Sequence, residues 1–181
     1  MAGSGDDDPV ILVDSDDIAI GTAAKLDAHR RGLKHRAISV LVRNSAGQFL
    51  LQRRSTAKYH SGGLWTNACC SHPLPGENPA DAARRRLAQE MGFSCPIDPL
   101  FVFQYETPVP GGLIENELVH VFGGRHDGAI APDPAEVSEW KWIAFPNLVA
   151  DMAARPDAYT VWFRHYVGQQ GAAISKWLGA G

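Results

Sequence analysis

The sequence predicts an α+β fold, in which strands and helices follow one another along one chain. Apolar segments of strand length lie at 37–43 and 49–54, and again at 100–106 and 115–124. Between the two pairs lies the segment 78–92, which carries signals for both ends of a helix. Strand pairs grouped around a helix, without a regular βαβ alternation, are typical of the α+β class.

The first strand pair is predicted to form a β-hairpin. The runs "AISVLVR" (37–43) and "FLLQRR" (49–54) are rich in apolar residues, and the loop between them contains the turn formers Asn44 and Gly47. We therefore expect the two strands to pair across this loop.

The central helix has readable ends. Asn78 suits the N-cap, Pro79 the first helical position and Asp81 the first turn, while Gly92 provides the C-terminal stop. We expect the helix to fill the interval between these signals.

The remaining segments predict three strands and two more helices. The strands are expected at 100–106, 115–124 and 139–145, the first two separated by the turn-rich "TPVPGG". The helices are expected at about 147–155 and 160–178, separated by a proline, because the residue before a proline disfavours helical backbone.

Length and composition indicate one globular domain. The chain has 181 residues, of which 45% are hydrophobic, and this is enough for one compact core. We expect residues 10–181 to form that domain and residues 1–9, "MAGSGDDDP", to form a flexible acidic terminus. The net charge of -3 and the absence of a basic tract longer than "RRR" (84–86) argue against a nucleic-acid partner.

Targeting signals are absent from the sequence as given. The first residues lack the basic and apolar regions of a signal peptide, and no apolar run approaches the ~18 residues of a membrane span. We therefore expect a cytoplasmic protein without a membrane partner, whose thiols stay reduced. A monomer is a separate expectation, which these signals do not bear on.

The stretch "TNACCSHP" (66–73) places two cysteines side by side. A structural zinc knuckle usually pairs its ligands as C-x2-C and H-x3-H, which adjacent cysteines do not satisfy. In a strand, neighbouring side chains point to opposite faces, so Cys69 and Cys70 cannot both enter one pocket. Cys95 lies far along the chain, and we expect it to act as a small buried hydrophobe.

Charged residues on the predicted helix have two interpretations. Arg86 and Glu90 are four residues apart and share a face, which by itself indicates a surface ion pair. However, the segment "SHPLPGENPADAARRRLAQEMGF" (71–93) resembles the Nudix box, a loop-helix-loop whose glutamates hold divalent cations against a diphosphate. The positions that match the box are Glu77, Arg85, Leu87, Glu90, Gly92 and Phe93.

Three positions depart from that box. Ser71 replaces its opening glycine, Arg86 replaces a glutamate, and Gln89 replaces the first of its paired glutamates. The lost carboxylates would assemble a cluster of metal ions and activate water for hydrolysis. We therefore expect this box to hold a diphosphate through one ion without cutting it.

The altered box beside a thiol resembles the type I isopentenyl-diphosphate isomerases, which are Nudix-fold enzymes. The resemblance covers about residues 10–162 and rests on spaced motifs: "AHRRGLKHRA", "QRRSTAKYHSGGLWTNACCSHP", the box, "ENE" at 115–117, and a late tryptophan. It implies a mixed β-sheet sandwiched between α-helices. It also implies the interconversion of isopentenyl and dimethylallyl diphosphate, in isoprenoid precursor biosynthesis.

The resemblance assigns the proton-transfer groups. Moving a double bond in an unactivated alkene needs two acid-base groups facing each other across a dry pocket. The family motif N-x-x-C-x-H-P places Cys70, rather than Cys69, opposite Glu117. Tyr105 is placed next to Glu117 to carry a proton, and Trp162 is expected to stabilise a cationic intermediate through its indole face.

The resemblance also implies two metal sites and a cationic site for the diphosphate. A tight ion, zinc or manganese, suits imidazole and carboxylate ligands, and magnesium on Glu90 would bridge the phosphate oxygens. The implied ligands of the tight ion are His29, His35, His72, Glu115 and Glu117, and the implied phosphate binders are Lys25, Arg54, Lys58 and Arg86.

The other histidines and tryptophans are interpreted as structural. We expect a surface or core position for His60, His120, His126 and His165, and core packing for Trp65, Trp140, Trp142 and Trp177. Two other functions remain open: a Nudix hydrolase acting on nucleoside diphosphates, which the residues at 86 and 89 disfavour, and a non-catalytic metal-binding module, which would not explain the phosphate binders.

Overall fold

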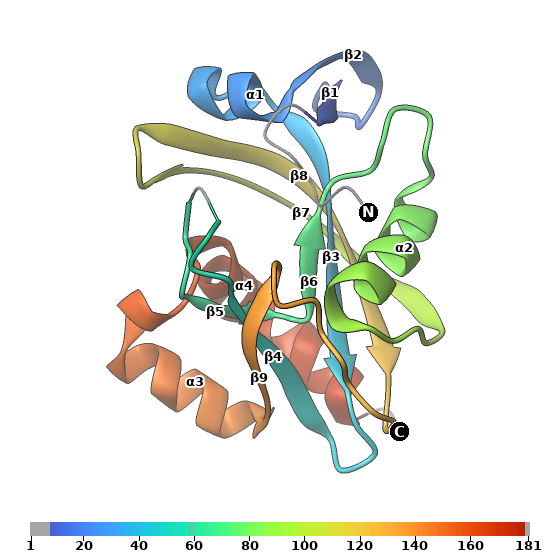
Figure 1. Cartoon of the computed structure of the whole chain (residues 1–181), viewed down its shortest axis with the longest axis vertical. Helices are drawn as coiled ribbons and strands as arrows, with labels where there is room; N and C mark the ends of the chain where they lie inside the picture. The colour runs from blue at the N-terminus through green and yellow to red at the C-terminus, as the bar shows by residue number, and fades with distance from the viewer. Residues whose placement is uncertain (1–7, 59, 180–181) are drawn as a thin grey trace.

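The structure, a computed structural model, describes residues 8–58 and 60–179 (Figure 1). Its elements follow the order β1 (Pro9–Val13), β2 (Ala19–Ala24), α1 (Lys25–Arg31), β3 (His35–Arg43), β4 (Gln48–Arg54), β5 (Trp65–Asn67), β6 (Cys69–Ser71), α2 (Pro79–Met91), β7 (Ile97–Val109), β8 (Leu113–Arg125), β9 (Val137–Ala144), α3 (Phe145–Ala154), a short 3-10 turn (Pro156–Ala158) and α4 (Val161–Gly179). The predicted α+β class is confirmed.

Strand β3 organises the mixed sheet. It pairs in parallel with β8 from His35↔Glu117 to Arg43↔Arg125, and antiparallel with β6. Its residues alternate between two hydrophobic clusters, because Ala37 and Leu41 belong to one and Ile38 to the other. Both faces of β3 are therefore buried, which explains its nearly continuous apolar sequence.

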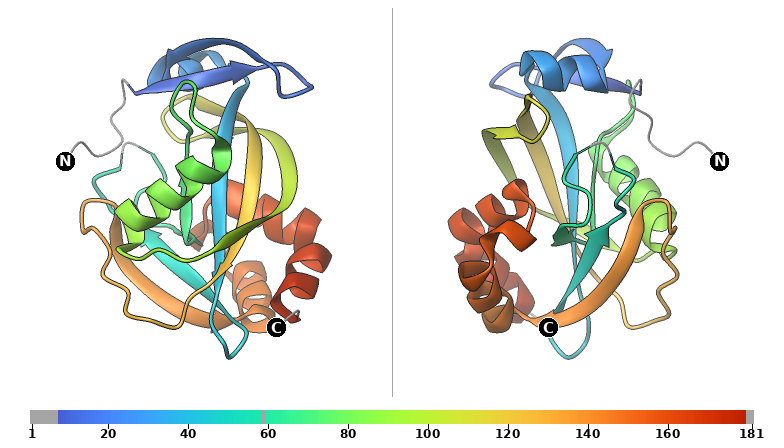
Figure 2. Two further views of the ribbon diagram at one scale, coloured as in Figure 1. Left: turned by 90° about the vertical axis from the view of Figure 1, so that its right-hand side faces the viewer. Right: turned by 60° about the vertical axis from the view of Figure 1, so that its left-hand side comes forward.

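Helices cover both faces of the sheet, as expected. Helix α2 lies against one face, where Leu87 and Met91 join the cluster of Ile38, while α3 and α4 lie on the other (Figure 2). Helix α1 and the β1–β2 pair cap one end of the sheet (Figures 1 and 2). The site described below opens among these layers.

Helix α2 confirms the predicted ends. The Asn78 side chain accepts a hydrogen bond from the Ala80 amide at 2.9 Å, and Pro79 is the first helical residue. Gly92 ends the helix in the left-handed region, with φ 72°, and a Cβ there would lie 2.0 Å from the carbonyl oxygen of Ala131. Both the backbone conformation and the close approach require glycine.

The predicted first hairpin is wrong beyond its loop. The turn forms, and the Asn44 side chain accepts hydrogen bonds from the amides of Ala46 and Gln48. However, β3 and β4 pair only at Arg43↔Phe49. The strands diverge because β8 and β6 occupy the edges of β3, while β4 pairs with β5 and β9.

The later strands and helices occur where predicted, with longer strands. β7 and β8 form one hairpin, and the 3-10 turn at Pro156–Ala158 separates α3 from α4. The β1–β2 pair, α1 and β5 were not predicted, and β6 was anticipated only through the strand geometry assigned to Cys69 and Cys70. Strand β1 begins at Pro9, inside the segment expected to be flexible, and residues 1–7 lie outside the described residues.

Candidate active site

A cavity of about 330 Å³ lies where α1, α2 and α4 meet the strands β4, β6, β7 and β8. It is lined by every residue predicted for the site except His35, which is fully buried. The sequence thus identified side chains that converge from seven separate elements. The lining members of the predicted set are Lys25, His29, Arg54, Lys58, Cys70, His72, Arg86, Glu90, Tyr105, Glu115, Glu117 and Trp162.

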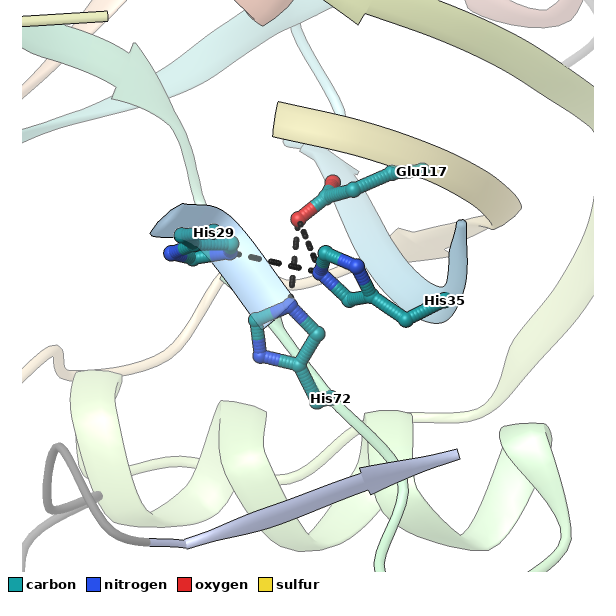
Figure 3. Close-up of side chains that lie close together, drawn as sticks. All are labelled: His29, His35, His72 and Glu117. Carbon is teal, nitrogen blue, oxygen red and sulfur yellow. Dashed lines mark hydrogen bonds and ion pairs between the residues drawn. The ribbon is translucent and has the colours of Figure 1, made fainter. Parts of the chain in front are cut away.

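Four of these predicted residues form a compact cluster. His29, His35, His72 and Glu117 each offer a ligand atom, and these atoms all lie within 4.8 Å of one another (Figure 3). The Nε2 atoms of His29 and His35 are 3.3 Å apart, and the Nε2 of His72 lies 3.0 Å from the Glu117 carboxylate. Such convergent nitrogen and oxygen ligands suit a divalent transition-metal ion.

The sheet register creates the cluster. His35 opens β3 directly opposite Glu117 on β8, and His72 follows β6, which pairs with the other edge of β3. His29 comes from the last turn of α1. Three segments that are distant in sequence therefore meet at one end of β3.

The tautomer of His35 fits a metal ligand. Its Nδ1 lies 2.8 Å from the carbonyl oxygen of Leu33, which can only accept, so Nδ1 carries the proton. The Nε2 lone pair then points into the cluster, an arrangement that metal-binding histidines commonly use.

Burial keeps the other imidazoles neutral. It lowers the pKa of His29 to about 3, with further lowering by His72, and it lowers the pKa of His72 to about 4 despite the hydrogen bond to Glu117. Neutral imidazole is the form that binds metal. The four residues therefore fit a divalent ion at neutral pH.

Glu115 lies beside this cluster, outside the four-residue set. The Tyr105 hydroxyl is 2.9 Å from Glu115 and 2.8 Å from Glu117, and it has one proton to donate. Burial and the neighbouring Glu117 charge raise the pKa of Glu115 well above its usual value. Burial alone would also raise the pKa of Glu117, but the hydrogen bond with His72 and the adjacent His35 ring hold that pKa well below its usual value. The pKa values of these adjacent carboxylates thus move in opposite directions.

His60 joins the site, contrary to its predicted structural role. It lines the cavity with its Nε2 3.6 Å from a Glu115 oxygen, and its ring centroid lies 5.7 Å from that of His29 and 6.0 Å from that of Trp162. Burial, followed by Arg54, lowers its pKa to about 3. The only signal in the sequence was its position within the motif at 52–73.

The other three histidines do take structural positions: His120 pairs with Asp17, His126 stacks on Phe93, and His165 is half-buried.

The two adjacent cysteines face opposite ways, as predicted. Cys69 is fully buried in the cluster beneath α2, whereas Cys70 lines the cavity. The Cys70 thiol donates to the Asn67 side chain at 3.1 Å and lies 3.4 Å from the Ser39 hydroxyl. Burial raises its pKa to about 12, with a smaller opposite effect of Ser39, so the thiol keeps its proton. Cys95 is half-buried and packs against the same cluster as Cys69.

Trp162 forms a fixed wall of the cavity. Its indole nitrogen donates to the Thr66 hydroxyl at 3.1 Å, and the Arg54 guanidinium lies 5.3 Å from the ring centroid. Trp65, Trp142 and Trp177 pack against the core as predicted. The prediction is wrong for Trp140, which is 38% exposed on β9.

The other end of the cavity is a network of charges. Arg86 donates to Glu90 at 2.8 Å and to Glu136 at 3.3 Å, Lys58 also pairs with Glu136, and the Gln52 side chain donates to Glu90 at 3.1 Å. Glu136 and Gln52 were not predicted, Glu136 because it lies on a segment without a recognisable motif, and Gln52 although it opens the motif at 52–73. They join the site only through tertiary contacts.

Residues 33–163 match the NUDIX domain family, so the fold and the site described above are those of a NUDIX-domain protein. Two solved structures share the fold. A Deinococcus radiodurans protein has a TM-score of 0.68 at 23% identity, covering 81% of this chain and 90% of its own. The MutT protein of Methanosarcina mazei has a TM-score of 0.63 at 18% identity, covering 77% and 94%.

The sequence relatives are more specific. An "Isopentenyl-diphosphate Delta-isomerase" of Burkholderia multivorans is 50% identical over 91% of this chain and 94% of its own length. "Isopentenyl-diphosphate Delta-isomerase 1" of Aromatoleum aromaticum is 53% identical over 86% of this chain and 88% of its own. The chain belongs to the isopentenyl-diphosphate Delta-isomerase family.

Proposed function

We propose that this protein is an enzyme that isomerises isopentenyl diphosphate to dimethylallyl diphosphate, adding a proton to one carbon and removing one from another. The observation that carries the proposal is the cavity itself, which brings a thiol, a tyrosine-carboxylate pair and a cationic network together. The names and identities of the relatives support the same reaction.

Cys70 and Glu117, assisted by Tyr105, are the proposed proton-transfer groups. The thiol is protonated, the Glu117 carboxylate is ionised, and the Tyr105 hydroxyl donates to Glu117 at 2.8 Å. One donor and one acceptor thus line the cavity before substrate binds. General acid-base groups of this kind typically accelerate a reaction by about 10²- to 10⁴-fold.

The histidine cluster is the proposed site of one tight divalent ion, manganese or zinc, held by His29, His35, His72, Glu117 and the adjacent Glu115. When bound, the ion supplies positive charge that stabilises the Glu117 carboxylate. Magnesium on Glu90 is proposed to accompany the diphosphate, with Lys25, Arg54, Lys58 and Arg86 binding phosphate oxygens.

Trp162 is proposed to stabilise the positive charge that develops on the substrate. Its side chain lines the cavity, and a cation over an indole face gains about 0.5 to 2 kcal/mol, more when water is excluded. The hydrogen bond to Thr66 holds the ring in place without using its face.

Isotope incorporation tests the reaction. Thiol, phenol and carboxyl protons exchange with solvent, so isopentenyl diphosphate in heavy water should give an allylic product with deuterium in a methyl group. Phosphate release should stay at background. Glu117→Gln should stop incorporation, and Tyr105→Phe, which keeps the carboxylate, should slow it. Rapid phosphate release without a deuterated product would instead indicate a hydrolase.

The setting proposed for the enzyme is a cytoplasmic monomer, formed by residues 10–181 and without a nucleic-acid partner. Among the described residues, no helix has the length and apolarity needed to cross a membrane. Light scattering after size exclusion should give the mass of one chain, 19.6 kDa, and a dimer mass would contradict the proposal.

A further inference from the structure

One buried carboxylate at the diphosphate end has no role in the function proposed above. Glu136 is 7% exposed and lines the cavity. One of its oxygens lies 3.3 Å from the Arg86 guanidinium, and the other pairs with the Lys58 ammonium. Glu136 therefore pairs with two of the cationic side chains that the proposed function assigns to phosphate binding.

The backbone holds Glu136 in this position. Its carbonyl accepts from the Ser55 amide at 2.9 Å, and its own amide donates to the Asp133 carbonyl at 2.9 Å. The Asp133 amide in turn donates to the Glu90 carbonyl at 3.0 Å. The loop that carries Glu136 is thus attached both to the end of α2 and to the loop before Lys58.

Glu136 and Glu90 share one arginine. The same Arg86 nitrogen lies 2.8 Å from a Glu90 oxygen and 3.3 Å from a Glu136 oxygen, and both carboxylates are more than 90% buried. Two carboxylates this close to one cationic nitrogen present oxygens to one small volume. Magnesium commonly takes one or two carboxylates together with substrate phosphates.

A second observation points to an anionic ligand at the same place. Among the described residues, neither the Arg86 Nε nor the Arg54 Nε has a hydrogen-bond partner, although both atoms are buried and both side chains line the cavity. Buried guanidinium donors without partners are costly, and phosphate oxygens would satisfy them.

Charge balance links the two observations. In the structure, Lys58 and Arg86 are matched by Glu90 and Glu136. A diphosphate carries more negative charge than Lys25 and Arg54, the two other proposed phosphate binders, can match, and excess charge in a buried site is unfavourable without a compensating cation. A divalent cation between the carboxylates and the phosphates would restore the balance and release both side chains for phosphate.

We propose that Glu136 is, with Glu90, a second carboxylate that binds the divalent cation entering with the diphosphate. Before substrate binds, Glu136 neutralises Lys58 and Arg86, and on binding it exchanges these partners for the cation. The inference rests on the diphosphate site of the proposed function, but not on the isomerisation chemistry.

The test uses inorganic pyrophosphate as the probe and compares its Kd without and with Mg²⁺, by calorimetry on the full-length protein loaded with its tight metal. The ratio of the two constants measures how strongly the cation assists binding. Glu136→Gln removes the charge and keeps the shape. It should tighten binding without Mg²⁺, because the cations lose a competitor, and weaken binding with Mg²⁺. The ratio should therefore fall by about 10- to 100-fold.

The matched control is Glu139→Gln, which removes a carboxylate paired with Arg53 at an exposed position three residues further on. It should leave the ratio unchanged. If Glu136 only positions Lys58 and Arg86, its replacement should weaken binding under both conditions and preserve the ratio, which would overturn the inference. A wild-type protein that binds pyrophosphate equally with and without Mg²⁺ would overturn this inference and the proposed magnesium on Glu90 but not the cationic phosphate site, whereas loss of isomerase activity alone would concern only the reaction.

Discussion

At the scale of single residues, environment decides the role more than residue type does. Cys69 and Cys70 are chemically identical neighbours on β6, yet one is core and one faces the cavity. Glu115 and Glu117 lie two residues apart on β8, yet their pKa values move in opposite directions, because of the two only Glu117 is hydrogen-bonded to a histidine, His72. The strand alternation explains the first contrast, and the partners explain the second.

Replacing each cysteine separately should show this contrast. Cys70→Ala should lower kcat by about 10²-fold or more, because it removes a proton-transfer group. Cys69→Ala should retain most activity and cost about 1 to 2 kcal/mol in the free energy of unfolding, because it leaves a small void in the core. Kinetic assays and urea titrations measure the two effects. Equal loss of kcat in both variants, with folding intact, would mean that the wrong thiol has been assigned.

Metal analysis tests the histidine cluster. His72→Ala removes an imidazole whose Nε2 faces Glu117 at 3.0 Å, and the dialysed variant should retain well under one equivalent of tight metal. His126→Ala is the control, because that ring stacks on Phe93 away from the cavity, and it should keep the full equivalent. A full equivalent in His72→Ala would contradict the proposed ligand set.

At the scale of elements, α2 connects stability to the site. The helix carries Arg86 and Glu90 on its inner face, and the chain segment 131–136 packs against its C-terminal end. Gly92 is the point of contact, because its missing Cβ makes room for the carbonyl of Ala131. The same residue therefore ends the helix and determines how closely the loop bearing Glu136 approaches.

Two glycine substitutions separate these effects. Gly92→Ala and Gly76→Ala both place a Cβ at positive φ, 72° and 80°, which costs about 1 to 2 kcal/mol. Only at Gly92 would the Cβ also collide with backbone, whereas nothing lies within 4 Å of it at Gly76. Urea unfolding should therefore show a loss of about 3 kcal/mol or more for Gly92→Ala and about half of that or less for Gly76→Ala. Similar losses would show that the loop moves away freely.

At the scale of the whole molecule, the cavity gathers titratable groups that the metal-free protein buries at a cost. Burial lowers the pKa values of His29 and His60 to about 3 and that of His72 to about 4, from 6.5. The unfolded chain therefore binds these protons at a higher pH than the folded chain does. Glu115, with its raised pKa, has the opposite effect on proton uptake, because the folded chain holds its proton more tightly than the unfolded chain does, but it accounts for only one proton.

The stability of metal-free protein should consequently fall as the pH drops below 6.5. Unfolding then takes up as many as about two net protons, so the free energy of unfolding should decrease by about 2 to 3 kcal/mol per pH unit down to about pH 5. Urea titrations at a series of pH values measure the slope. In His60→Gln, unfolding should take up about one proton fewer, so the decrease in stability per pH unit should be smaller by about 1 kcal/mol. An unchanged slope in this variant would contradict the neutral state assigned to His60.

The sequence by itself determined the features that depend on local physical chemistry. The ends of α2 follow from the Asn78 cap and from Gly92, and the opposite faces of Cys69 and Cys70 follow from strand geometry. The predicted site residues, except His35, also line one cavity, because the spaced motifs contain the residue types that its chemistry needs.

Only the tertiary structure decided which distant residues meet. The parallel register of β3 and β8 places His35 opposite Glu117, and the loop attached to α2 places Glu136 against Arg86. Neither contact follows from local spacing, because register is set when both faces of β3 are packed beneath the helices. For the same reason the predicted hairpin opened after one residue pair, and His60, predicted to be structural, lies beside Glu115 in the site.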